Sequence, residues 1–145
     1  MTVVFDAGPL LAFAFDEPGA EAVEEWLDRV YDGDRAGYVA TITLADVRYI
    51  AARKASPEEA DAHIRRLLEL GLTECEIDDC WQTASELKRK YALAVGDAYA
   101  VAAAVDLDAD GEKMTLLVGA DDGFDAVEND PDRQQLIERF RTEAV

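Results

Sequence analysis

Residues 2–15, TVVFDAGPLLAFAF, indicate the fold class of the chain. The first four are apolar or β-branched and run into Asp6, a pattern typical of a short buried strand. A turn at Gly8 and Pro9 then leads into a short apolar helix, which DEPG at 16–19 closes. A buried strand followed directly by a helix is the repeating unit of α/β proteins, so the same alternation is expected further along.

The rest of the chain continues this alternation without a linker or an internal repeat. We predict strands at 37–41, 72–77 and 114–119, helices at 18–30, 44–51, 56–71, 78–92, 97–105 and 130–144, and a loop at 106–113. Strands alternating with helices favour a mostly parallel sheet covered on both faces. We therefore predict one three-layer α/β domain over residues 1–145, with a central sheet of four to five strands flanked by helices.

The charge of the chain is strongly acidic. It has 32 acidic against 14 basic residues and a net charge of −18, and the excess is spread along the whole sequence. Such a surface repels itself unless salt screens it, and the Debye length falls to about 3 Å at 1 M salt. The composition therefore predicts a halophilic host. The sequence has no membrane-length apolar stretch and no basic-then-apolar leader, so we expect a soluble cytoplasmic protein without a membrane partner.

Four aspartates lie at or near the ends of predicted strands. Asp6 ends the first strand and Asp121 follows the fourth. Asp46 lies in the first turn of the helix after the second strand, and Asp97 opens a helix inside the apolar run YALAVGDAYAVAAAV at 91–105. Since α/β proteins bind their ligands at the carboxyl ends of strands, these four side chains are the candidate functional residues.

Each aspartate taken alone has a structural alternative. Asp46 can be the acid of a capping box with Thr43, Asp97 and Asp121 can be helix N-caps, and Asp6 can form a turn. Taken together, carboxylates held close would not all ionise without compensation. A hard divalent cation, Mg²⁺ or Mn²⁺, provides it, whereas zinc would need a His or Cys cluster. Such sites activate water for phosphodiester cleavage.

Four motifs at matching spacing give the chain a family resemblance. They are VVFDAGPLLAFAFDEPGAEAVEEWL at 3–27, TLADVRYIAARK at 43–54, VGDAYAVAAA at 95–104 and TLLVGADDGFDAV at 115–127. The chain resembles the PIN domains, and most closely the VapC-like toxins of type II toxin–antitoxin pairs. The resemblance implies that Asp6, Asp46, Asp97 and Asp121 take the family's acidic positions. It further implies a metal-dependent ribonuclease that cleaves RNA, forms a homodimer and is inhibited by a cognate antitoxin.

Three positions depart from the family pattern. Asp46 stands where the family usually has Glu, Gly8 where it commonly has Ser, Thr or Asn, and Gly119 where it commonly has Thr or Ser. Hydroxyls at such positions orient ligand carboxylates, and their loss lowers metal affinity or activity about 10- to 100-fold. The departures support an alternative, a decayed site retained for binding or scaffolding. Asp122 either supplies replacement charge or faces solvent.

The sequence lacks the marks of two other functional classes. A haloacid-dehalogenase-like phosphatase would need a second Asp at position 8, and a receiver domain needs an acid pair and a later lysine that the sequence lacks. A housekeeping RNA-processing nuclease without an antitoxin is a further alternative. His63 is expected to be structural or to lie on the surface. Trp26, Trp81 and Phe140 fall at helical spacing among aliphatic residues, so we expect them in the core or at a subunit interface. The basic residues are expected to form a solvated helix face, with a phosphate-positioning rim as the alternative: Arg48, Arg53, Lys54, Lys88, Arg89 and Lys90.

Overall fold

The sheet has five strands, and all of them run parallel. The computed structural model describes residues 1–108, 113–133 and 135–143. The strands are β1 (Thr2–Phe5), β2 (Ala36–Ala40), β3 (Thr73–Cys75), β4 (Met114–Val118) and β5 (Ile137–Arg139). Their order is β3-β2-β1-β4-β5, which places β1 and β4 side by side in the interior of the sheet. The mostly parallel α/β sheet predicted from the sequence is confirmed.

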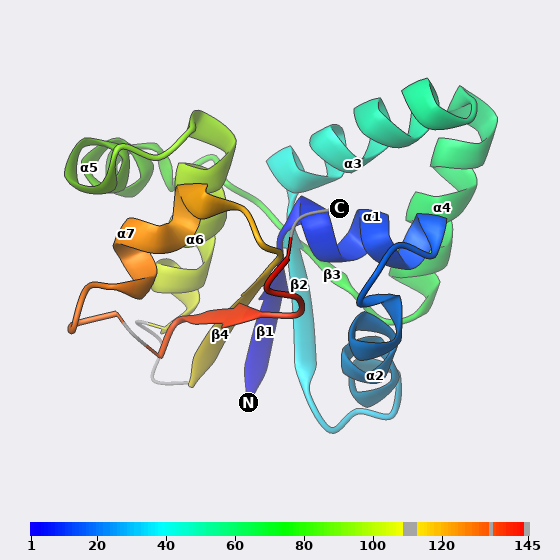
Figure 1. Ribbon diagram of the computed structural model, residues 1–145, viewed down its shortest axis with the longest axis horizontal. Coiled ribbons are helices and arrows are strands. Elements are labelled where there is room, and N and C mark those ends of the chain that lie inside the picture. The colour runs from blue at the N-terminus through cyan, green and yellow to red at the C-terminus, as the bar shows by residue number, and fades with distance from the viewer. Residues whose placement is uncertain (109–112, 134, 144–145) are drawn as a thin grey trace.

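Helices cover both faces of the sheet. They are α1 (Ala7–Phe15), α2 (Ala20–Tyr31), α3 (Thr41–Lys54), α4 (Pro57–Glu69), α5 (Trp81–Tyr91), α6 (Val95–Asp108), the short 3-10 helix η1 (Asp122–Phe124) and α7 (Asp125–Glu128). Helices α1–α4 lie on one side and α5–α7 on the other, which gives three layers (Figure 1). Among the described residues, none of the helices is both long enough and apolar enough to cross a bilayer.

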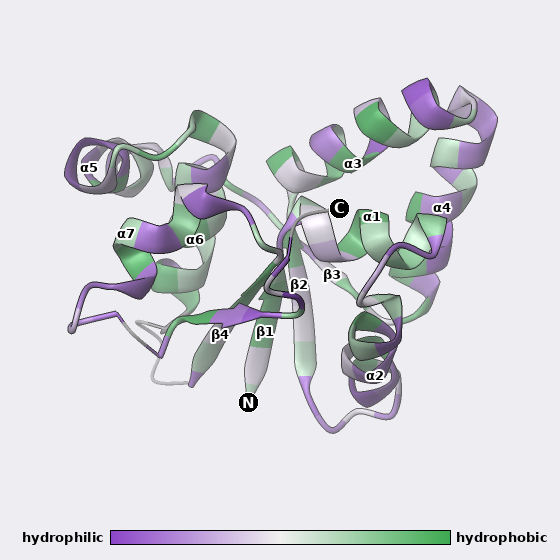
Figure 2. Ribbon diagram, in the orientation of Figure 1, coloured by the Kyte–Doolittle hydropathy of each residue, from purple (hydrophilic) through white to green (hydrophobic). Residues whose placement is uncertain are grey.

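Side chains of the central strands point alternately into two hydrophobic cores, one on each face of the sheet. Val3 and Phe5 of β1 pack with α1–α4, whereas Val4 between them packs with α5 and α6. Leu117 and its neighbour Leu116 divide in the same way along β4. The central strands are therefore apolar on both faces, and the outward turns of the helices carry the polar residues (Figure 2).

Helix α6 approaches the sheet closely because its buried side chains are small. Ala98, Ala100, Ala102, Ala103 and Ala104 are all fully buried. The helix contacts β1, β2 and β4, and it also contacts α3 from the opposite layer. Its first turn is thereby held near the carboxyl edge of the sheet.

The predicted closing helix at 130–144 is wrong. Residues 131–133 form a turn and Ile137–Arg139 form β5, which pairs in parallel with Leu116–Val118. Leu136 and Ile137 are adjacent in sequence, and both are buried in the core of α5–α7. Without β5, the backbone of β4 would have an unpaired edge. Pairing this edge and burying two apolar side chains stabilises the strand more than the helical spacing of the apolar residues stabilises a helix. Residues 134, 144 and 145 of that prediction lie outside the described residues.

The remaining element boundaries shift by a few residues. The predicted third strand at 72–77 is only Thr73–Cys75, and α6 begins at Val95, two residues before Asp97. Ser56 caps α4 as expected, because its side chain accepts a hydrogen bond from the Glu59 N–H at 3.1 Å. The predicted loop at 106–113 begins later, since α6 continues to Asp108, and residues 109–112 of that prediction lie outside the described residues.

Candidate functional site

Asp6 and Asp121 follow the two neighbouring central strands. Asp6 comes directly after β1 and occupies the N-cap position of α1. Its backbone N–H donates to the carbonyl oxygen of Leu117 at 3.0 Å, which ties the end of β1 to the end of β4. Asp121 lies three residues beyond Val118, the last residue of β4. The structure therefore places both acids at the carboxyl edge, as predicted.

The structural alternatives differ in outcome among the four aspartates. Asp6 is the single residue between β1 and α1, which agrees with a role in the turn. Helix α3 begins at Thr41 with Ala40 as its N-cap, so Asp46 lies in the second turn and is not part of a capping box. Asp97 is inside α6 and is not its N-cap. Asp121 does cap η1, since its Oδ1 accepts a hydrogen bond from the Gly123 N–H at 2.9 Å. That bond leaves the second carboxylate oxygen of Asp121 for another partner.

The four carboxylates act on one another electrostatically. Burial raises the pKa of Asp6 to about 7, with further contributions from the charges of Asp97, Asp121 and Asp46 and a partial offset by the Ala7 N–H. Burial likewise raises the pKa of Asp97 to about 6, again with the charges of Asp121 and Asp46. Residues distant in sequence thus share one local field at the sheet edge.

Two glycines make room for these carboxylates. A Cβ atom at Gly123 would lie 3.2 Å from both Asp121 Oδ1 and Asp97 Oδ2, and one at Gly96 would lie 3.3 Å from Asp46 Oδ2. Asp121 therefore approaches Asp97 at Gly123, and Asp46 approaches the start of α6 at Gly96. Sequence reasoning missed both glycines as site residues, although each lies within two positions of an acid.

The donor set fits a hard divalent cation. All four candidate ligands are carboxylates, the oxygen donors that Mg²⁺ and Mn²⁺ prefer. The raised pKa values of Asp6 and Asp97 show that these groups lack a compensating positive charge. As the side chains stand, no three His, Cys, Asp or Glu residues in the described part of the chain are close enough to hold a metal ion. The fit therefore rests on donor type and charge.

A comparison with protein families identifies the fold. The profile of the PIN domain matches residues 3–130, which contain all four candidate aspartates. The chain belongs to the PIN domain family. The comparison with curated protein sequences found no match.

Several solved structures are similar in fold to this chain. A chain of VapBC2 from Rickettsia felis, bound to a DNA fragment from their promoter, has a TM-score of 0.73 at 14% identity and covers 96% of this chain and 98% of its own. DNA-bound VapBC from Salmonella typhimurium has a TM-score of 0.67 at 15% identity, covering 97% and 98%. VapBC-1 from nontypeable Haemophilus influenzae has a TM-score of 0.66 at 14% identity, covering 97% and 98%. At these identities the likeness shows the shared fold.

The two glycine departures of this PIN domain face each other. A Cβ atom at Gly8 would lie 3.7 Å from the Gly119 nitrogen, which is ordinary contact, so a larger residue fits there. A Cβ atom at Gly119 would lie 3.2 Å from the ring of Phe140. Phe140 thus occupies the space that a larger residue at 119 would need. Asp122 is exposed, and its charge is not among those acting on Asp6 or Asp97.

The basic residues of the predicted phosphate rim all have partners within this PIN domain. They donate to or pair with acidic side chains, a tyrosine hydroxyl or a backbone carbonyl: Arg48 with Asp61, Arg53 with Tyr49, Lys54 with Glu17, Lys88 with Leu93, Arg89 with Glu86 and Lys90 with Asp130. This arrangement agrees with the solvated-face interpretation, because each of these cations already has a partner on the protein itself.

The aromatic residues and His63 are structural to different degrees. His63 is half-buried with its ring 5.5 Å from that of Phe15. Trp26 stacks on the guanidinium of Arg35. Trp81 is 59% exposed, so it is not a core residue, and its alternative place at a subunit interface stays a prediction.

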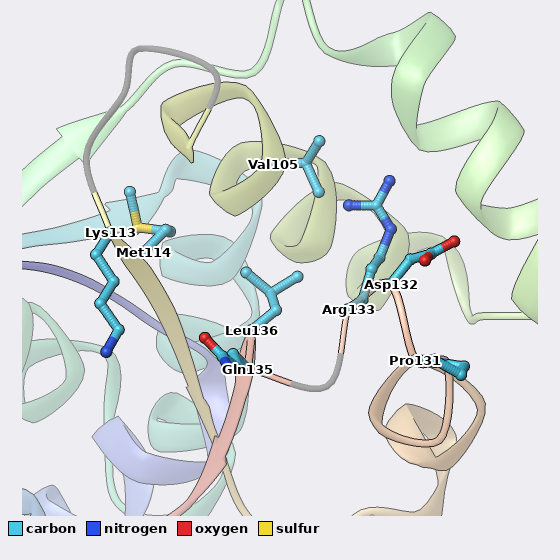
Figure 3. Close-up of a pocket in the computed structure, with 8 residues that line it drawn as sticks. All are labelled: Val105, Lys113, Met114, Pro131, Asp132, Arg133, Gln135 and Leu136. Atoms are coloured by element: carbon cyan, nitrogen blue, oxygen red, sulfur yellow. The ribbon is translucent and has the colours of Figure 1, made fainter.

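A separate pocket lies away from the four acids. It has a volume of about 280 Å³ and is lined by residues such as Lys113, Met114 and Arg133 (Figure 3). Met114 is the first residue of β4, so this pocket opens at the amino edge of the sheet. The candidate site is at the other edge, and the pocket does not contribute to it.

Proposed function

We propose that this PIN domain is a Mg²⁺- or Mn²⁺-dependent endoribonuclease of the VapC-like toxin type. The observation that carries the proposal is the grouping of Asp6, Asp46, Asp97 and Asp121 at the carboxyl edge of a PIN fold, where burial, and then the charges of neighbouring aspartates, raise the pKa values of Asp6 and Asp97. Partly buried carboxylates with raised pKa values are costly to keep unless they bind a cation. Their maintenance beside two glycines that make room for the acids supports a functional role.

Each acid has a distinct part in this proposal. Asp6 and Asp97 are the partly buried ligands, and Asp121 offers the carboxylate oxygen that its bond to the Gly123 N–H leaves free. Asp46, exposed and one methylene shorter than the family's usual Glu, acts from the outside of the cluster. A bound cation would supply water activation and charge neutralisation for phosphodiester hydrolysis. The chain's own carboxylates bind and orient that cation.

The partners follow from the same acids. When the cation is absent, four carboxylates at one edge attract a basic side chain, so we propose a cognate antitoxin that places an Arg or Lys there. The likeness to chains of VapBC structures supports this partner. We further propose a homodimer that acts on RNA in the cytoplasm of a halophilic host, where salt screens the net charge of −18.

Cleavage of total RNA in molar KCl tests the enzymatic proposal. Wild type should cut RNA with Mg²⁺ or Mn²⁺ and stop with EDTA, and Asp97→Asn should lower the rate by about 1,000-fold because it removes a charged ligand while preserving shape. If Asp97→Asn cuts as fast as wild type, the site is misplaced. The toxin assignment fails separately if expression of the wild type is harmless and pull-downs recover no small basic partner.

The second candidate is a PIN domain with a decayed site that serves as a binding protein. Gly8 and Gly119 favour it, because neither can orient a ligand carboxylate through a side chain. A Mn²⁺ titration separates the candidates: a decayed site shows only weak surface association, whereas the nuclease shows a saturable site that Asp6→Asn removes.

A further inference from the structure

Arg139, the last residue of β5, holds the loop that carries Asp121. Its Nη1 donates to the carbonyl oxygen of Gly119 at 2.7 Å and to that of Asp121 at 2.9 Å. The guanidinium is anchored on its other side by Asp125, whose Oδ1 accepts from Nη2 at 2.8 Å, and by the Glu128 carboxylate at 3.2 Å from Nε. The side chain is only 12% exposed. One arginine therefore joins β5, the loop and α7.

These contacts determine where the Asp121 carboxylate lies. Residues 119–121 join β4 to η1 outside both elements. Among the backbone hydrogen bonds of the described residues, their carbonyls accept only a long one, from the Phe124 N–H to the Asp121 oxygen at 3.5 Å. The planar fork of an arginine can meet several acceptors at once, which an ammonium group cannot do with the same geometry. Arg139 fixes the backbone on both sides of Ala120, and the Gly123 N–H fixes the Asp121 side chain.

Arg139 acts on the loop and not on the charge of the acid cluster. Its charge meets Asp125 and Glu128, and it is not among the groups that shift Asp6 or Asp97. Arg139 therefore does not compete with a cation for these carboxylates. We propose that Arg139 is a positioning residue, which holds Asp121 in reach of the metal that the other aspartates bind. This inference rests on the proposed function of Asp121 as a ligand.

Arg141 offers a matched control on the same segment. It has the same side chain and is similarly buried at 17% exposure, yet its Nη1 donates to Pro18 O at 3.1 Å and Glu17 Oε1 at 3.4 Å, in the turn between α1 and α2. Substitution of either arginine removes a partly buried cation with several hydrogen bonds. Only the substitution of Arg139 releases the carbonyls of Gly119 and Asp121.

The experiment measures Mn²⁺ affinity of the full chain by electron paramagnetic resonance, in KCl at which circular dichroism shows each variant folded. Arg139→Gln should weaken Mn²⁺ binding about 10- to 100-fold, as expected when the support of a ligand is lost. Arg139→Lys should weaken it less, and Arg141→Gln should leave it within about 2-fold of wild type. Saturating Mn²⁺ should restore RNA cleavage by Arg139→Gln, because Asp121 itself is still present.

Two results would overturn the inference, one by excluding the role of Arg139 and the other by excluding the proposed site itself. If folded Arg139→Gln binds Mn²⁺ like wild type while Asp121→Asn does not, Asp121 is a ligand but Arg139 does not position it. If Asp121→Asn also binds Mn²⁺ like wild type, the proposed site itself fails. Should Arg139→Gln not fold, Asp125→Asn replaces it, since this exposed substitution weakens one anchor of the guanidinium, and an unchanged Mn²⁺ affinity there overturns the inference equally.

Discussion

The candidate site divides into an inner pair, Asp6 and Asp97, and an outer pair, Asp46 and Asp121. The inner carboxylates are partly buried, and burial is the largest cause of their raised pKa values. The outer carboxylates are exposed, and their charges further raise the pKa values of the inner pair. Water can solvate the outer pair, whereas burial and neighbouring charges oppose ionisation of the inner pair near neutral pH when no cation is bound.

The largest expected effect separates the pairs by activity. Asp6→Asn should lower Mn²⁺-dependent RNA cleavage by about 1,000-fold or more, whereas Asp46→Asn should lower it by about 10- to 100-fold, since Asp46 acts from the exposed side. Asp46→Glu, with the family's usual reach, should retain or raise the rate. Initial rates on one RNA in molar KCl, with EDTA blanks, check this. Equal losses for Asp6→Asn and Asp46→Asn would remove the distinction between the pairs.

High salt should screen the repulsion among the exposed acids and should have little effect on the inner pair, Asp6 and Asp97. The net charge of −18 predicts loss of circular dichroism signal as KCl is lowered, beginning well above physiological ionic strength. The change in stability caused by Asp6→Asn should be nearly the same at high and at moderate salt, because buried charges are screened much less. A fully native spectrum in dilute buffer would contradict the first expectation and the halophilic host with it.

The difference in metal-free stability between wild type and Asp6→Asn reports on Asp6. Its folded pKa of about 7 lies above the usual 3.8, so the unfolded chain releases this proton first. The contribution of Asp6 to stability therefore falls as the pH rises from about 4 to about 7, and Asp6→Asn should be the more stable form above pH 7 by on the order of 4 kcal/mol. Urea unfolding of both proteins in EDTA measures the difference. A difference that persists at pH 4 would have another origin.

The smallest expected effect tests the two glycines. Gly123→Ala brings a methyl group against both Asp97 and Asp121, so it should weaken Mn²⁺ binding about 10-fold. Gly96→Ala meets only Asp46, in the outer pair, and should weaken it about 3-fold or less. Isothermal titration of both variants, in the same KCl solution, compares them. The reverse order would place Asp46 closer to the metal than Asp97.

Local pattern was sufficient to predict most of the sheet and the acids at its edge. The run at residues 2–5 and Asp6 needed only apolar periodicity and the rule that parallel strands end at one edge. Asp97 was conspicuous because it interrupts an apolar run, and that run is buried as α6. The assignment of the four acids as ligands stays a prediction.

The region after Asp130 required information that local pattern does not contain. Leu136, Ile137 and Phe140 have helical spacing, yet Ile137 pairs with β4 and Phe140 packs on Gly119. The pairing depends on the free edge of β4, and the packing depends on the absence of a side chain at Gly119. Both features belong to residues far away in the sequence. Arg139 was missed for the same reason, because its carbonyl acceptors lie 18 and 20 positions earlier in the chain.

The late place of β5 in the chain has a consequence for synthesis on the ribosome. All four aspartates emerge before Arg139, and Asp121 precedes it by 18 residues. At about 5–20 residues per second, about 1 to 4 seconds pass between the synthesis of Asp121 and that of Arg139. During this interval the four aspartates are present without the arginine that holds the loop of Asp121. If Arg139 positions Asp121 as proposed, a nascent chain gains its full affinity for metal only after this interval. An RNA-cleaving toxin would then be weakest while still close to the ribosome that makes it.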